Sequence, residues 1–336
     1  CPPNPCTTAP AMRSPAPEPE ASALPLAAPE AAEQLLRRLE WTVIRRLDGQ
    51  RQGDYRTLLR GAGLDLADLR EYRAGDDVRH IDWNVTARLQ VPHVRVFTED
   101  REMDIWFVLD LSPSMDFGSG SRTKNTAALE FTAVLARLLT RHGNRVGALL
   151  HDGQGGTAGA HSNGVDATVP VRGGRRHVLH LLHTVLRHQA AHAAGHTRLA
   201  DLLRSAAGQL RRRSTVLLVS DFFSEPGWEK PLGQLALRHE VVAVRLFDPL
   251  EHSLPDLGLL PVRDAETGET LMVDTHDAGF RRRFAAAAQA REEHLLGALT
   301  RAGVDTLELA TDDDLPGALT RFMDMRQRRV RTGAAA

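Results

Sequence analysis

Three oxygen-bearing side chains follow a strongly apolar segment of the chain at alternate positions. Residues 105–109 have the composition of a buried strand, and Asp110, Ser112 and Ser114 come directly after them. A carboxylate and two hydroxyls in one short loop suit Mg²⁺, Mn²⁺ or Ca²⁺ better than zinc or copper. Serine and aspartate are also common after strands as turn residues and helix caps. The spacing Asp-x-Ser-x-Ser therefore predicts either a divalent-cation site or an ordinary turn.

A second apolar segment ends in the same way and favours the cation site. Residues 214–219 read STVLLV and lead directly into Ser220 and Asp221. In an open α/β sheet the carboxyl ends of parallel strands meet at one edge, where ligands bind. Thr197 precedes an apolar-periodic helix and offers a further hydroxyl, which can cap that helix or bind a metal. We expect one Mg²⁺ site at the solvent end of the sheet, formed by Asp110, Ser112, Ser114, Thr197 and Asp221.

The elements that must position these residues alternate between strands and amphipathic helices. Further strands are expected at 146–151, 241–247 and 305–310, and a turn at 266–269 predicts a β-hairpin. The expected helices cover 127–142, 176–192, 198–212, 232–238, 278–301 and 315–328. Strands that alternate with helices pair in parallel through right-handed crossovers. The predicted fold class is therefore α/β, with a doubly wound, mainly parallel sheet preceded by a smaller extended or β segment.

Composition divides the chain into four parts. Residues 1–30 are rich in Pro and Ala and lack periodicity, which is typical of a disordered leader. A charged N-terminal segment at 31–100 precedes the α/β domain at 101–330, and 331–336 are expected to be a flexible tail. The numbering begins at a cysteine, and Met12 is an alternative translation start.

The N-terminal segment carries many alternating acids and arginines. We expect extended chain at 78–83 and a strand at 94–98, and charges of this kind most often form structural ion pairs. The segment closely resembles the signature of a bacterial family named domain of unknown function 58. The residues that carry this resemblance are Tyr72, Arg73, Gly75, Asp76, Asp77, Arg79, Asp82, Trp83 and Arg88.

The resemblance to this family extends from about residue 35 to residue 325. Its members place the signature before a von Willebrand factor type A-like domain, whose metal-ion-dependent adhesion site resembles the five oxygen-bearing residues. The resemblance also implies a partner, because such proteins are commonly encoded beside MoxR-type AAA+ ATPases and are thought to act with them on client protein complexes. Further matching residues are Thr123, Lys124, Asp248, Pro249, Glu251 and the turn 266–268.

Several other functions are disfavoured by the sequence. Six histidines between 177 and 196 lack the acidic residue of an HExxH zinc motif, so we expect them on a solvated helix face. Residues 118–124 lack the glycine that precedes lysine in a phosphate-binding P-loop. The net charge is −1 and the arginine runs lack interleaved aromatics, so no nucleic-acid partner is expected.

The sequence also indicates a cellular compartment. No apolar run reaches the length of a membrane span, and no signal peptide is visible. Cys1 and Cys6 match no zinc or redox motif, and the rest of the chain is free of cysteine. We therefore expect a cytoplasmic protein.

Three functions of different classes remain open. The favoured one is a non-enzymatic, Mg²⁺-dependent protein-binding adaptor that acts with a MoxR-type AAA+ ATPase. The alternative is a metal-dependent hydrolase that uses the same ion to activate water. It needs a general base, yet the two site loops contain no His or Glu, and Asp116 is the nearest spare carboxylate. A purely structural α/β domain is the third.

Overall fold

The computed structural model describes most of the 336-residue chain. The described residues are 28–44, 68–73, 78, 81–96, 102–152, 164–189, 198–263 and 269–333.

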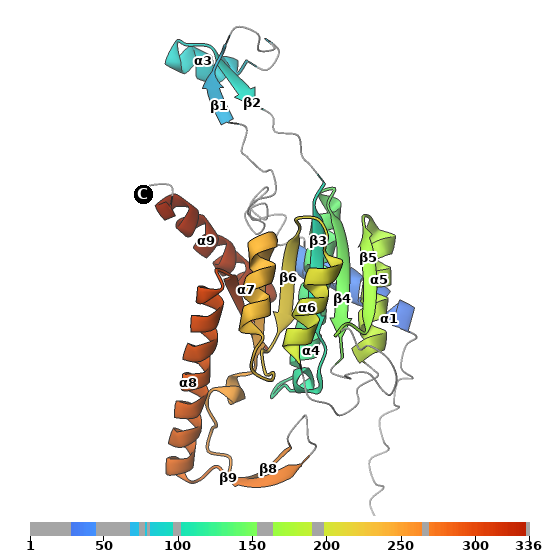
Figure 1. Cartoon of the computed structure of the whole chain (residues 1–336), viewed down its shortest axis with the longest axis vertical. Helices are drawn as coiled ribbons and strands as arrows, with labels where there is room; N and C mark the ends of the chain where they lie inside the picture. The colour runs from blue at the N-terminus through green and yellow to red at the C-terminus, as the bar shows by residue number, and fades with distance from the viewer. Residues whose placement is uncertain are drawn as a thin grey trace, which may run out of the picture.

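A six-stranded sheet in the order β10-β7-β6-β3-β4-β5 forms the centre of the fold (Figure 1). All neighbouring strands pair in parallel except β4 and β5. The predicted α/β fold with a mainly parallel sheet is confirmed. The antiparallel edge strand β5 was not predicted, because only Val169 in it is buried and no apolar run marks it. The strands are β3 (Asp104–Asp110), β4 (Arg145–His151), β5 (Ala167–Arg172), β6 (Thr215–Ser220), β7 (Glu240–Phe247) and β10 (Asp305–Ala310).

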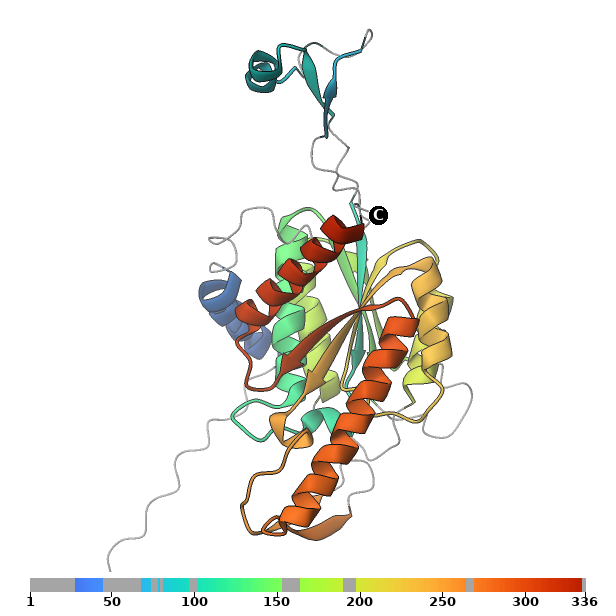
Figure 2. The ribbon, with the colours of Figure 1, turned by 90° about the vertical axis from the view of Figure 1, so that its left-hand side faces the viewer.

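Helices cover both faces of this sheet, as Figure 2 shows. Successive strand residues point to opposite faces, so Phe107 and Leu109 pack under one helical layer and Val108 under the other. The first layer consists of α1 (Ala28–Leu39), α4 (Lys124–Arg141), α5 (Arg175–Gln189) and α9 (Leu315–Gly333). The second layer consists of α6 (Leu199–Gln209), α7 (Glu229–Arg238) and α8 (Ala278–Arg301).

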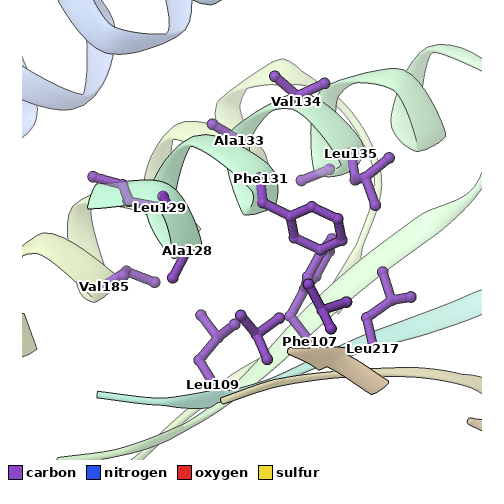
Figure 3. Packing of buried hydrophobic residues seen from close by; sticks show 14 of the residues in the cluster. Phe107, Leu109, Ala128, Leu129, Phe131, Ala133, Val134, Leu135, Val185 and Leu217 are labelled. Carbon is purple, nitrogen blue, oxygen red and sulfur yellow. The ribbon is translucent and has the colours of Figure 1, made fainter. Parts of the chain in front are cut away.

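The larger hydrophobic cluster fixes α4 on the sheet. Phe131 of α4 points toward Phe107 of β3 and Leu217 of β6 (Figure 3). The exposed fractions of Phe131 and Phe107 are 1% and 0%. Complete burial of such a side chain contributes about 1.5–3 kcal/mol. This packing holds the start of α4 at the carboxyl end of the strands, where Lys124 is its first residue.

The first described helix joins the same cluster. α1 continues into the short helix η1 (Glu40–Ile44), and Leu36 and Ile44 are buried against the first helical layer. Arg175 of α5 lies 2.8 Å from Glu33 of α1 and adds an ion pair. This helix was expected in the N-terminal segment at 31–100, but its apolar residues contribute to the core of the α/β body.

A small module occupies residues 68–96. Its strands β1 (Asp68–Glu71) and β2 (His93–Val96) pair antiparallel, and α3 (Trp83–Leu89) lies between them in sequence. The expectation of extended chain as far as residue 83 is wrong at Trp83, because Asp82 begins a helix there. The Asp82 carboxylate accepts hydrogen bonds from two backbone N–H groups of α3, which is helix N-capping.

The predicted hairpin is present as β8 (Leu259–Arg263) and β9 (Thr270–Asp274), which pair antiparallel. It lies beside one end of α8, at the bottom of Figure 1. Among the described residues, no helix combines the length and the apolar character required to cross a bilayer.

Candidate functional site

The predicted site lies where the winding of the sheet reverses. Asp110 is the last residue of β3, and Asp221 directly follows β6, the strand beside it. From β3 the chain first builds β4 and β5 on one side and then places β6 on the other. Ligand sites of open α/β sheets lie at this kind of position, outside the carboxyl ends of the strands.

Asp110 is held by uncharged hydrogen-bond donors. Its carboxylate accepts from the Ser220 hydroxyl at 2.6 Å and from the Ser112 backbone N–H at 3.0 Å. The side chain is completely buried, and burial together with the negative charge of Asp221 raises the pKa of Asp110. A cation beside Asp110 would relieve this unfavourable environment.

The two serines of the loop lie together. Ser112 precedes the short helix η4 (Pro113–Asp116), and its hydroxyl oxygen lies 3.2 Å from that of Ser114 within this helix. Ser112 is buried and Ser114 is half-buried. The structure therefore groups both predicted hydroxyls in the loop that begins at Asp110. Thr197, the remaining predicted ligand, lies outside the described residues.

Lys124 joins the candidate site, although its sequence context predicted no role for it. Its ammonium lies 2.6 Å from a carboxylate oxygen of Asp221 and 2.6 Å from one of Glu251, with 1% of the side chain exposed. Burial alone would lower the pKa of Lys124, but the two carboxylates outweigh burial and raise it. Lys124 is therefore charged and neutralises part of the site. The only hint in the sequence was the Thr123–Lys124 pair at the start of the helix, which matches the family resemblance but suggests no role for the lysine.

The position of Lys124 at the beginning of a helix needs an explanation. The N-terminus of a helix carries a partial positive charge, so a cation is electrostatically unfavourable there. The paired carboxylates of Asp221 and Glu251 overcome this effect at Lys124. The lysine is therefore placed by its acidic partners and not by helix preference.

A third carboxylate, Asp248, fixes the loop before Lys124. It accepts hydrogen bonds from the Ser119 N–H at 2.8 Å and from the Thr311 hydroxyl at 2.6 Å. Burial would raise the pKa of Asp248, but these hydrogen bonds outweigh burial and lower it. Gly118 permits the tight loop, because a Cβ at this position would lie 2.2 Å from the Arg122 carbonyl oxygen.

Glu251 is fixed by the same segment of the chain. It ends the short helix η5 (Pro249–Glu251), which follows β7, and Asp248 caps this helix. The second carboxylate oxygen of Glu251 accepts from the Asp248 backbone N–H at 3.0 Å. Glu251 is thus held between Lys124 and the backbone.

The backbone after Asp221 adopts an unusual conformation. Phe222 has φ +60°, in the left-handed region that side chains with a Cβ rarely adopt. The conformation costs about 1–2 kcal/mol and is held by hydrogen bonds from the Phe222 N–H to Ser220 and from the Phe223 N–H to Asp221. Such backbone outliers cluster at functional sites, so the loop adds support to this location.

A cleft of about 430 Å³ adjoins the site. Asp221 and Glu251 line it together with Phe223, and Arg291 and Glu292 of α8 contribute further lining. The cleft therefore gives the site a route of access, although Asp221 itself is only 3% exposed.

The expectation that the carboxylates lie at the solvent end of the sheet is wrong in one respect. They do lie at the carboxyl end, but Asp110 and Asp221 are 0% and 3% exposed. Hydrogen bonds to the backbone at Ser112 and Phe223 turn the two loops back over their own carboxylates.

The donor chemistry of the site fits a hard divalent cation. Two carboxylates and two hydroxyls offer oxygen ligands of the kind that Mg²⁺ prefers. Within the described ranges, no group of three or more His, Cys, Asp and Glu side chains is placed to hold a metal. An ion at this position would therefore depend on the hydroxyls of Ser112 and Ser114 as well as on the carboxylates.

The signature residues have structural positions in the small module where they are described. Asp82 caps α3, Arg88 lies in its last turn, and Trp83 is 70% exposed. The Tyr72 backbone N–H donates to the Pro92 carbonyl at 2.7 Å, and Arg73 follows it. Gly75, Asp76, Asp77 and Arg79 lie outside the described residues.

Solved structures that match this chain include proteins of two Bacteroides species. BatB from Bacteroides thetaiotaomicron is 13% identical with a TM-score of 0.39, covering 67% of this chain and 99% of that chain. An aerotolerance-related membrane protein from Bacteroides fragilis is 12% identical with a TM-score of 0.41 and the same coverage.

Sequence relatives include uncharacterized proteins of Mycobacterium tuberculosis and Mycobacterium bovis. Each is 37% identical over 298 residues, which cover 89% of this chain and 90% of the relative. The family described as "Protein of unknown function DUF58" matches residues 68–294. The chain therefore belongs to the DUF58 family.

Proposed function

We propose that this protein is a non-enzymatic, Mg²⁺-dependent protein-binding adaptor. Asp110, Ser112 and Ser114 would hold the ion from one strand end, and Thr197 and Asp221 from the other. Mn²⁺ or Ca²⁺ would be accepted by the same oxygen ligands. In this proposal the α/β body is a von Willebrand factor type A-like domain, and an acidic group of the bound protein completes the shell of the ion.

One observation carries this proposal. The loop that begins at Asp110 groups the Ser112 and Ser114 hydroxyls beside a buried carboxylate whose pKa is raised by burial and by Asp221. A divalent ion that bridges the two strand ends would offset the negative charge that raises this pKa. The cleft lined by Asp221 offers a route of access from the surface.

The proposed partner is a MoxR-type AAA+ ATPase, with which the adaptor would mature or remodel a client protein complex in the cytoplasm. This part of the proposal rests on the family resemblance of the signature residues and of Thr123–Lys124, Asp248 and Glu251. ATP hydrolysis would belong to the partner, because residues 118–124 do not form a P-loop motif.

The hydrolase alternative has less support from the geometry. It requires a general base near the ion, and Glu251 is connected to Asp221 through their shared ion pairs with Lys124. Both carboxylate oxygens of Glu251 are engaged, one by Lys124 and one by the Asp248 N–H. We therefore favour binding over catalysis.

The decisive experiment is affinity capture from native lysate with tagged wild type and Asp110→Ala, each with magnesium and with chelator. The adaptor hypothesis expects an AAA+ ATPase or its client to be recovered by wild type with magnesium only. Asp201→Ala is the matched control, because Asp201 lies on α6 in an exposed pair with Arg204. It should capture the same proteins as wild type.

Two other outcomes would change the proposal. Capture of the ATPase regardless of magnesium and of Asp110 would keep the partner and move the interface away from the metal. Recovery of no ATPase under any condition would contradict the proposed partnership, and a hydrolase assay would follow.

A further inference from the structure

The buried ammonium of Lys124 supplies positive charge beside Asp221, where a bound metal ion would otherwise supply it. It lies 2.6 Å from Asp221, a proposed metal ligand, and 2.6 Å from Glu251. Oδ2 of Asp221 meets Lys124 and Oδ1 accepts from the Phe223 N–H, so an ion bound to either oxygen of this carboxylate would lie within a few ångströms of the ammonium. Two unit charges a few ångströms apart repel strongly in a site of low effective dielectric constant.

The surroundings of Lys124 offer its ammonium another place. Besides Glu251, the ring centroids of Phe223 and Phe117 lie 5.1 Å and 6.0 Å from the ammonium. Aromatic faces attract cations at such distances. If Lys124 leaves Asp221, it can therefore remain paired with Glu251 near these rings, without becoming a buried cation that lacks a counter-ion.

We propose that Lys124 is an internal competitor of the divalent ion, so that the Lys124–Asp221 pair and metal binding exclude each other. This inference rests on the proposed metal site and adds its regulation. Glu251 acts as the alternative partner that keeps the ammonium when the ion enters. The competition weakens metal affinity in the free protein, and a partner that supplies an acidic ligand would raise that affinity through linkage.

The test measures Mn²⁺ binding to the full chain by electron paramagnetic resonance, since free Mn²⁺ gives a signal that bound Mn²⁺ loses. Lys124→Met removes the competing charge and should tighten Mn²⁺ binding by about tenfold or more. Lys124→Arg keeps the competing charge, so its Mn²⁺ affinity should stay within about threefold of wild type despite the different geometry of the guanidinium.

Glu251→Gln gives an independent readout with the opposite sign. It removes the alternative partner of Lys124 and leaves Asp221 as its remaining carboxylate, so Mn²⁺ binding should weaken by about tenfold. A purely structural salt bridge would behave differently, because loss of either partner would weaken binding through damage to the fold. Glu251 is half-buried, so this variant also serves if Lys124→Met does not fold.

The outcomes separate this inference from the proposed function. Tighter Mn²⁺ binding by Lys124→Met together with weaker binding by Glu251→Gln supports competition. If wild type binds Mn²⁺ and Lys124→Met binds it equally or more weakly, competition is overturned and the metal site stands.

If Lys124→Met binds Mn²⁺ and wild type does not, the result supports competition but contradicts a metal-dependent native site. If neither wild type nor Lys124→Met binds Mn²⁺, both the competition and the metal site are overturned. If Lys124→Met does not fold, unchanged or tighter binding by Glu251→Gln overturns competition.

Discussion

Asp110 and Asp221 end neighbouring strands and are both buried, but their negative charges are balanced in different ways. Asp221 lies 2.6 Å from the ammonium of Lys124. Asp110 accepts hydrogen bonds from Ser220 and Ser112, which are uncharged, and its pKa is raised by burial and by Asp221. The same sequence pattern, an apolar strand that ends at an aspartate, therefore occurs in two adjacent loops whose carboxylate charges are balanced differently.

The difference shows which half of the site is complete within the chain. The Asp221 side has a counter-ion of its own and needs no ligand for its stability. The Asp110 side has oxygen ligands but, among the described residues, no ion pair of its own, and the neighbouring His151 opposes the rise of the Asp110 pKa without outweighing burial and Asp221. A binding ion would therefore improve the environment of Asp110 and disrupt that of Asp221, so its net effect on stability is a balance between the two sides.

The largest expected effect comes from breaking the paired side. Asp221→Asn should lower the free energy of unfolding by about 3 kcal/mol, because it leaves a buried ammonium with one carboxylate instead of two. Urea denaturation in chelator measures this loss, with Asp201→Asn as the control on an exposed helix pair. A loss no larger than that of the control would mean that Asp221 does not balance the charge of Lys124.

Asp248 sharpens the comparison, because hydrogen bonds from uncharged donors are enough to stabilise the charged form of this carboxylate. Its bond from the buried Thr311 hydroxyl measures 2.6 Å, and Thr311→Val should cost about 2 kcal/mol, typical of a hydrogen bond to a charged group. Thermal unfolding of the variant provides the measurement. Thr320→Val is the matched control, since that hydroxyl bonds a helix carbonyl. Equal losses would show that Asp248 gains nothing special from Thr311.

The smallest effect is expected on the unpaired side. Asp110→Asn should change the free energy of unfolding in chelator by less than about 1 kcal/mol, since a repulsive charge and a hydrogen bond are lost together. The effect should depend on pH. The folded-state pKa of Asp110 is raised above its ordinary 3.8, so the folded protein binds the proton more tightly than the unfolded chain. Its contribution is complete below pH 3.8 and is lost as the pH rises through the folded pKa.

The measurement is a series of urea denaturations of wild type and Asp110→Asn from pH 3.8 upward. Relative to the variant, wild type should lose stability as the pH rises. If the difference in unfolding free energy between wild type and Asp110→Asn does not change with pH, the proposed electrostatic contrast between Asp110 and Asp221 is contradicted.

The sequence predicted the fold better than the contacts within the site. Long apolar or periodic segments specified β3, β6, α4 and α8, and the shared edge of Asp110 and Asp221 follows from parallel pairing. β5 was missed because an antiparallel edge strand with one buried residue, Val169, leaves little pattern. α3 was missed because its start depends on the Asp82 cap and none of its residues is buried. The Lys124–Asp221 pair joins residues 97 positions apart, which no local pattern reveals.

The packing of α1 has a consequence for the architecture of the whole chain. Leu36 and Ile44 belong to the core of the α/β body, and the body resumes at β3. The module built from β1, α3 and β2 lies between them in sequence, so it is an insertion within one folding unit and not a domain that precedes it. A fragment beginning at β3 would lack part of its own hydrophobic core and uncover the surface of α4 and α5 that α1 protects. The chain thus leaves the body after Ile44 and returns to it at Met103, which packs against the same core.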